Sequence, residues 1–199
     1  MNTPARSREP DPRIERSRRV VRQAALEELG DVGYGAFTIE SVAARSGVAK
    51  STIYRHWPGK LPLIADALET LNEQPNPTSG AEAEGDPRER VEQLVRHLAE
   101  VFVDSTLSAC IPALIEAAER DPDVRQFHHR YNRQRRQVLV DAIAEGVATG
   151  EFRPELDPEI AAIALVGPII YRRVMTGRPL DPDHVSTLID TVIGPSRGR

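Results

Sequence analysis

The sequence predicts an all-α protein, and two patterns support that prediction. Apolar residues recur at spacings of three and four, as along one face of a helix, and the period-two alternation typical of strands is absent. Asp-Pro pairs at 86–87, 121–122, 157–158 and 181–182 stand just before periodic segments. Asp caps free amide groups at a helix start, and Pro suits the first helical position because it lacks an amide hydrogen. Four helix starts are therefore expected.

The remaining segments suggest how the chain is divided. Gly30, Gly33 and Gly35 predict the end of a first helix. Residues 74–85, QPNPTSGAEAEG, contain almost no apolar side chain and predict a flexible connector. Residues 160–174 are apolar nearly all round, which predicts burial on more than one side. A small amino-terminal unit and a larger carboxy-terminal unit are expected on either side of the connector.

Charge is distributed unevenly over the 199 residues. The net charge is −4, but residues 1–60 hold 11 Lys and Arg against 7 Asp and Glu, so this part is net +4 and the remainder is net −8. An acidic surface repels a phosphate backbone, so any nucleic acid is expected at the amino-terminal part. The excess of four is modest, and many solvated helical faces carry a similar charge.

Cysteine content and hydropathy bear on the compartment. The single Cys110 rules out an internal disulfide, and no Cys/His cluster has zinc spacing, which favours a reducing compartment. The amino terminus has no apolar run of signal-peptide length, and no stretch approaches the ~20 apolar residues of a membrane span. We expect a cytoplasmic protein with no cofactor, no structural metal and no membrane association.

Residues 38–57, TIESVAARSGVAKSTIYRHW, predict two short helices joined by a tight turn. Thr38 can cap the first helix, Gly47 supplies the turn, and Val48 fills the corner between the helices. In the second helix, Ile53 and Trp57 lie four apart and can bury together. Their expected partners on the first helix of the chain are Val21, Ala25 and Leu29.

The outward side of the second short helix is polar and cationic. It carries Lys50, Ser51, Thr52, Tyr54, Arg55 and His56. Such side chains supply hydrogen bonds to base edges and contacts to phosphates in a major groove. An ordinary solvated surface helix would show a similar set at any one position, but the two helices, the turn and the apolar lock occur together in the basic part.

In the segment around these two helices, the chain resembles the TetR family of transcriptional regulators. The matching positions are Gly33, Phe37, Thr38, Val42, Ala43, Ser46, Gly47, Val48, Ala49, Thr52, Ile53, Tyr54, His56, Trp57, Lys60 and Leu63. The resemblance implies a three-helix DNA-binding domain at 15–75, with its helix-turn-helix at 38–57, and a helical ligand-sensing and dimerisation domain at 86–195. Pro62 departs from the pattern at the start of a fourth helix, where the first turn tolerates it.

The resemblance also implies roles for individual residues. Candidates for reading base edges are Lys50, Ser51, Tyr54 and Arg55. Candidates for holding phosphate oxygens are Thr38, Arg45, Thr52, His56 and Lys60.

For the acidic domain, the resemblance implies a homodimer and an unidentified small-molecule effector. Two helices, Pro158–Val174 and Pro182–Ile193, would pair with their copies, although 160–174 could instead be the central helix of a monomer. Nominal pocket residues are Phe102, Cys110, Leu114, Phe127 and Tyr131, each of which could equally be plain core. Cys110 has no nearby cation in the sequence and is expected to be inert.

A histidine pair and an arginine cluster also bear on function. His128 and His129 are adjacent, so on a helix they point about 100° apart and cannot chelate one ion together. The cluster Arg130, Arg133, Arg135 and Arg136 is expected to be a solvated surface with acidic partners. An anionic ligand or a second DNA contact is the alternative for that cluster.

The expected function is a ligand-responsive DNA-binding regulator. It would repress by binding a near-palindromic operator as a dimer and would be released by a small-molecule inducer. A helical enzyme is disfavoured because the sequence contains no G-x-x-x-x-G-K-[ST], H-E-x-x-H or G-x-S-x-G motif. A helical adaptor, which would show no salt-dependent affinity for DNA, remains the alternative.

Overall fold

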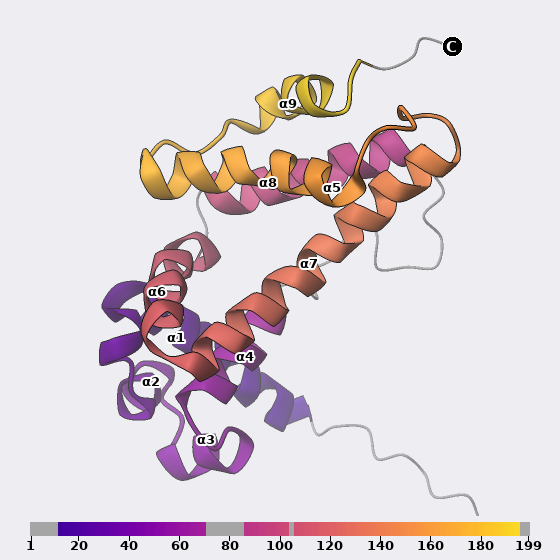
Figure 1. Ribbon diagram of the computed structural model, residues 1–199. Coiled ribbons are helices and arrows are strands. Elements are labelled where there is room, and N and C mark those ends of the chain that lie inside the picture. Colours follow the sequence, from indigo (N-terminus) through magenta and orange to yellow (C-terminus); the bar gives the residue numbers. More distant parts are fainter. Residues whose placement is uncertain (1–11, 71–85, 104–105, 196–199) are drawn as a thin grey trace, which may run out of the picture.

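The computed structural model describes residues 12–70, 86–103 and 106–195, and within these ranges it is helical without a strand (Figure 1). The α-helices are α1 Pro12–Ala36, α2 Ile39–Ser46, α3 Lys50–His56, α4 Lys60–Thr70, α5 Pro87–Val103, α6 Thr106–Arg120, α7 Pro122–Ala148, α8 Pro158–Met175 and α9 Val185–Val192. A short 3₁₀ helix, η1 Pro182–His184, precedes α9. The all-α prediction is confirmed, and the connector predicted at 74–85 lies outside the described residues.

The four predicted Asp-Pro helix starts are confirmed. Asp121 and Asp157 accept hydrogen bonds from amides in the first turns of α7 and α8. Asp86 Oδ1 accepts from the amide of Arg88 at 3.0 Å, and Asp181 does the same for η1. The caps satisfy amides that have no partner within the helix, which explains why the chain enters a helix at each point.

One of the three glycines expected to end the first helix, Gly33, does interrupt it, whereas Gly30 does not. α1 passes through Gly30 and is broken only at Gly33, whose φ of 74° lies in the left-handed region that favours glycine. Gly30 has a different role, because a Cβ atom there would lie 3.0 Å from the Cβ of Ala109 on α6. Gly30 therefore permits a close approach of two helices rather than ending one.

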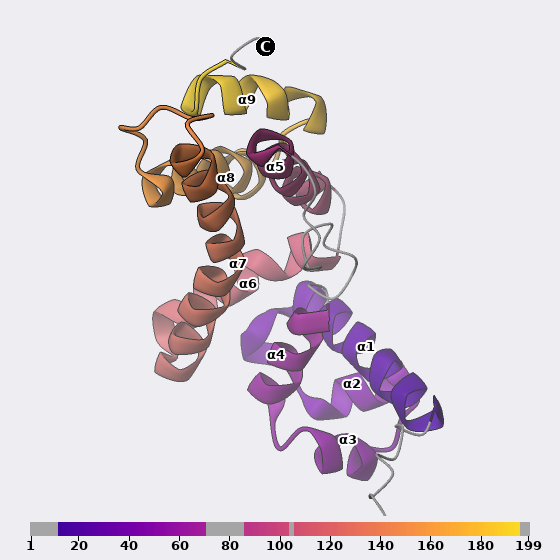
Figure 2. The same ribbon diagram turned by 90° about the vertical axis from the view of Figure 1, so that its right-hand side faces the viewer.

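Two hydrophobic clusters form the core, and they lie at opposite ends of the molecule (Figures 1 and 2). The first joins α1–α4 to α6 and to the beginning of α7. The second joins α5, the end of α7, α8 and α9. The first cluster thus extends across the predicted domain boundary and packs α1–α4 on the carboxy-terminal part of the chain.

α7 contributes buried side chains to both clusters. Its residues Val124 to Tyr131 pack in the first, and Leu139 to Ile143 pack in the second. The polar stretch between them, 132–138, carries most of the arginine cluster seen in the sequence. Arg136 pairs with Glu159 of α8 at 2.6 Å, and Arg135 donates to the hydroxyl of Tyr131 at 2.9 Å.

Charged side chains also hold the end of α9. Arg88 and Arg153 donate to the carbonyl oxygens of Gly194 and Ile193, at 2.8 Å and 3.2 Å. Nearby, burial together with a hydrogen bond and repulsion from Asp86 raises the pKa of Glu151 to about 7. Two carboxyl groups therefore share this corner and disfavour being ionised together.

No single helix among the described residues is long and apolar enough to cross a membrane. α5 and residues 108–120 of α6 reach the required length and composition only as a pair, and the pair is bent by 89°.

Candidate nucleic-acid interface

The predicted helix-turn-helix is present as α2, a turn and α3. Thr38 caps α2, because its Oγ1 accepts from the amide of Ser41 at 3.1 Å. Gly47 ends α2 with a φ of 68°, and its amide donates to the carbonyl of Ala43 at 3.0 Å. Only glycine adopts this left-handed conformation without strain, so the turn between the two helices depends on Gly47.

The inner side of α3 is locked by apolar contacts, as the sequence predicts. Ile53 and Trp57 are buried in one cluster with Val21, Ala25 and Leu29 of α1. Since the inner side chains are fixed, the polar residues of α3 are held on the opposite, outer side. Packing thus determines which side chains α3 presents to solvent.

Asp66 of α4 connects three helical segments, and sequence reasoning missed it. Its Oδ2 accepts from Trp57 Nε1 at 2.7 Å and from Arg22 Nε at 2.8 Å. Burial acts to raise the pKa of Asp66, but the hydrogen bonds from Arg22 and Trp57 outweigh it and lower the pKa. The only sequence signal was Trp57 itself, because a buried indole N–H requires an acceptor.

The four candidate base readers lie together on α3. Lys50, Ser51, Tyr54 and Arg55 are all exposed on this seven-residue helix. Lys50 is the one that also contacts another helix, since its Nζ lies 2.5 Å from Oε1 of Glu40 in the first turn of α2. The hydrogen bond with Lys50 lowers the pKa of Glu40, and the bond with Glu40 raises that of Lys50.

Unlike the base readers, the five candidate phosphate ligands do not lie together on one helix. His56 is exposed at the end of α3, Thr52 is half-buried, and the hydroxyl of Thr38 caps α2. Lys60 is half-buried, and its Nζ donates to the carbonyl of Tyr34 at 3.1 Å and lies 4.0 Å from the centre of that ring. Lys60 therefore joins α4 to α1, and its contact with phosphate stays a prediction.

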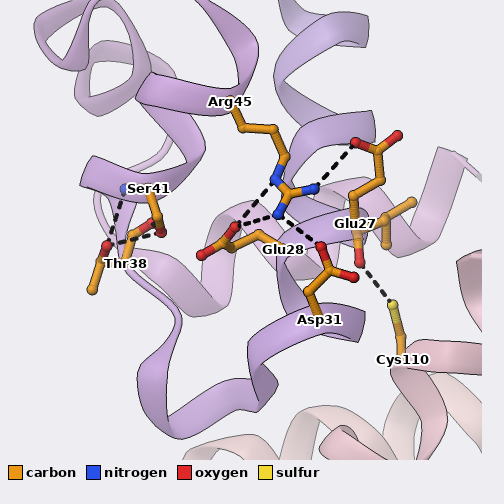
Figure 3. A network of polar contacts seen from close by, with 8 residues as sticks. Glu27, Glu28, Asp31, Thr38, Ser41, Arg45 and Cys110 are labelled. Atoms are coloured by element: carbon orange, nitrogen blue, oxygen red, sulfur yellow. Dashed lines mark hydrogen bonds and ion pairs between the residues drawn. The ribbon is translucent and has the colours of Figure 1, made fainter.

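Arg45 points toward α1 (Figure 3). Its guanidinium lies 2.7 Å from a carboxylate oxygen of Asp31, 3.0 Å from Glu28 and 3.7 Å from Glu27. The hydrogen bond that Arg45 donates to Asp31, together with the one that it donates to Glu28, raises the pKa of Arg45. These carboxylates already occupy the guanidinium, so a phosphate contact by Arg45 would compete with them.

The five nominal pocket residues are all buried in the hydrophobic clusters. Phe102 belongs to the second cluster, whereas the other four belong to the first. Cys110 donates its thiol to the carbonyl of Leu26 at 3.2 Å, and burial, with the nearby charge of Asp31, raises its pKa to about 12. A thiol with such a pKa is inert at neutral pH, as expected from the sequence.

The cavity between α1 and α2 and the cavity beside α9 are not lined by any of the five residues. The larger, about 370 Å³, lies between α1 and the end of α2. The smaller, about 250 Å³, lies beside the end of α9. The assignment of a ligand pocket to the five buried residues stays a prediction.

A capped α2, a glycine turn and an exposed polar α3 locked on an apolar base define a helix-turn-helix DNA-binding protein. Comparison with known proteins identifies the family. Residues 21–67 match the model of bacterial regulatory proteins of the tetR family, and residues 81–192 match that of the tetracyclin repressor-like carboxy-terminal domain. The chain belongs to the TetR family of transcriptional regulators.

Similar proteins agree with that assignment. The HTH-type transcriptional regulator YdeS of Bacillus subtilis is 30% identical over 183 residues, which are 89% of this chain and 88% of that protein. A TetR-family regulator from Rhodococcus sp. has a similar fold, with a TM-score of 0.72, 22% identity and coverage of 89% and 98%. The regulator FadR of Bacillus subtilis, solved in complex with stearoyl-CoA, gives a TM-score of 0.68 at 19% identity, with coverage of 88% and 98%.

Proposed function

We propose that this protein is a cytoplasmic repressor that binds a near-palindromic operator as a homodimer and is released by a small molecule. The observation that carries the proposal is the exposed row Lys50, Ser51, Tyr54 and Arg55, held outward by the burial of Ile53 and Trp57. A short helix with such an outer side can enter a major groove. Its donors and hydroxyls then meet base edges and phosphates.

The proposed dimer is supported by apolar side chains that α8 leaves exposed. Their spacing places them along one side of the helix. They are Ile160, Ile163, Tyr171 and Met175, with exposed fractions of 63%, 49%, 60% and 70%. Exposed apolar surface of this kind is typical of a protein interface, and a two-fold pairing would present two copies of α3 to successive major grooves, about 34–36 Å apart.

The proposed release by a ligand is supported by the packing of α6 on α1. Gly30 lies against Ala109, and Cys110 bonds the Leu26 carbonyl, so a displacement of α6 would be transmitted to the DNA-binding helices. A ligand among Phe102, Cys110, Leu114, Phe127 and Tyr131 would have to part these buried side chains and would thereby move α6. The stearoyl-CoA complex of the structurally similar FadR shows that a protein of this fold accepts such a molecule.

The proposal is tested in two steps. Binding sites are selected from a randomised duplex library, and the affinity for them is measured over a range of salt concentrations. The wild type should enrich a near-palindromic sequence and bind it with a strong salt dependence. Arg55→Ala or Lys50→Ala should relax the base preference, because base contacts carry the sequence information. If no sequence is enriched and DNA binding does not depend on salt, the result would favour the adaptor alternative.

A second set of variants separates phosphate contacts from base contacts. Lys60→Ala should weaken binding to all sequences about equally and reduce the salt slope by about 1. Arg120→Ala is the control, because Arg120 is an exposed cation at the end of α6 that pairs with Glu116 of the same helix, and its loss should leave both quantities unchanged. Equal losses for every variant on matched and scrambled duplexes would refute the division into base readers and phosphate ligands.

A further inference from the structure

A carboxylate lies within the surface that is proposed to meet DNA. Glu40 is the single acidic residue between Asp31 and Asp66 in the sequence. Its side chain and that of Lys50 are each more than half exposed, and the two charged groups are 2.5 Å apart. An anion here opposes the attraction of the phosphate backbone, so its presence among cations and hydroxyls requires a reason.

The alternative role for Glu40 is confined to its own helix, because a carboxylate in the first turn interacts favourably with the helix dipole. That role does not require contact with α3. The ion pair instead engages the first residue of α3, the helix that carries the other candidate readers. Because the pair is exposed, it is also free to exchange partners when a base edge replaces the surrounding water.

The pair has a donor and an acceptor side by side, and a G·C base pair matches both with two adjacent acceptors for the ammonium and one donor for the carboxylate. Guanine presents O6 and N7 as acceptors in the major groove, where a lysine ammonium binds them. The N4 amine of its cytosine partner is a donor that a glutamate carboxylate accepts. At thymine, the carboxylate would meet an oxygen acceptor and a methyl group, both of which are unfavourable.

We propose that Glu40 is a specificity-determining residue, and that Glu40 and Lys50 together read a G·C base pair in each operator half-site. Lys50 donates to guanine and Glu40 accepts from cytosine. On other sequences the two side chains remain paired with each other, so the ammonium of Lys50 contributes little to non-specific binding. This inference rests on the proposed DNA-binding function and assigns part of its sequence preference.

The experiment is selection from a randomised duplex library with the wild type, Glu40→Gln and Glu69→Gln. Glu69 is an exposed carboxylate on α4, so Glu69→Gln makes the same change of charge outside the α2–α3 surface. The wild type and Glu69→Gln should enrich the same motif, with a G·C pair at one position of each half-site. Glu40→Gln should lose about tenfold discrimination at that position only, as expected for a good base contact, and should bind random duplex more tightly.

Exchange of the two charges separates reading from a structural role. In the double variant Glu40→Lys with Lys50→Glu, an ion pair still joins α2 to α3, but donor and acceptor have changed places. If the pair reads bases, the preferred base at that position changes while the rest of the motif is kept. Thermal unfolding of each variant confirms that the domain remains folded.

Two outcomes would overturn different statements. A wild-type motif that Glu40→Gln and the charge exchange both leave unchanged would refute the role of Glu40 and keep the proposed function. Failure of the wild type to enrich any motif would refute the proposed function itself.

Discussion

The two ends of the molecule differ in which side chains they leave uncovered. At the amino-terminal end, polar contacts tie the helices together: Asp66 joins α1, α3 and α4, and Arg45 joins α2 to α1. At the opposite end, α8 leaves Ile163 and Tyr171 exposed to solvent. The surface proposed to meet DNA is thus held in place by contacts within one chain, whereas the α8 surface has exposed apolar area that the proposed second chain would cover. On the proposed function, folding of one chain would prepare each α3 surface, and pairing through α8 would place two of them on the operator.

The largest expected effect comes from a charge at the α8 surface. Ile163→Asp should leave the fold intact but prevent dimer formation, because the charge would be buried without a partner. Operator affinity should fall at least about a hundredfold, since binding of two linked half-sites is lost. Sedimentation and titration with a selected operator measure the two quantities.

The control for this prediction is Ile115→Asp, which introduces the same charge at an exposed isoleucine of α6. It should remain dimeric and bind normally. A monomeric wild type, or an Ile163→Asp variant that is still dimeric, would contradict the role given to α8.

The next largest effect concerns the polar contacts of the other end. Asp66→Ala should lower the free energy of unfolding by about 2–3 kcal/mol, because the buried indole of Trp57 and the guanidinium of Arg22 lose their acceptor. Glu69→Ala, on the exposed side of the same helix, should change it by less than about 0.5 kcal/mol. Urea unfolding compares the two, and equal small losses would show that Asp66 does not connect the helices energetically.

The smallest effect is a pH dependence at the end of α9. The pKa of Glu151 in the folded protein is raised to about 7, so its contribution to stability is full below the pKa of an unfolded Glu and is lost as the pH rises through about 7. Glu151→Gln should therefore be more stable than the wild type at about pH 8, by less than about 1 kcal/mol because the site is near the surface. Urea unfolding at about pH 5 and about pH 8 measures the difference.

Glu155→Gln serves as the control for this pH dependence, because Glu155 is exposed in the same loop. It should follow the wild type at both pH values. If Glu151→Gln also follows the wild type at both pH values, the carboxyl groups of Glu151 and Asp86 ionise independently.

Local signals account for what the sequence predicted well. The Asp-Pro caps, the turn at Gly47 and the α3 side defined by Ile53 and Trp57 each depend on residues within one or two turns of each other. The same local signals place Lys50, Ser51, Tyr54 and Arg55 together on the exposed side of α3.

The contacts that sequence reasoning missed join residues that lie far apart along the chain. Arg22 reaches Asp66 only because α4 folds back on α1, and Gly30 meets Ala109 across the two units. Arg45, taken as a phosphate ligand, faces the carboxylates of α1. Periodicity shows which side of a helix is polar, but it does not show which partner that side meets.

The continuity of α7 limits how the chain can change in length. Residues 132–138 link the two hydrophobic clusters without interruption of the helix. One inserted residue there would rotate one end of the molecule relative to the other by about 100° and displace it by about 1.5 Å along the axis. Substitutions of the exposed residues in this stretch are tolerable, whereas an insertion or deletion would misalign the two copies of α3 in the proposed dimer. Variation in length is therefore expected in the loops and not in α7.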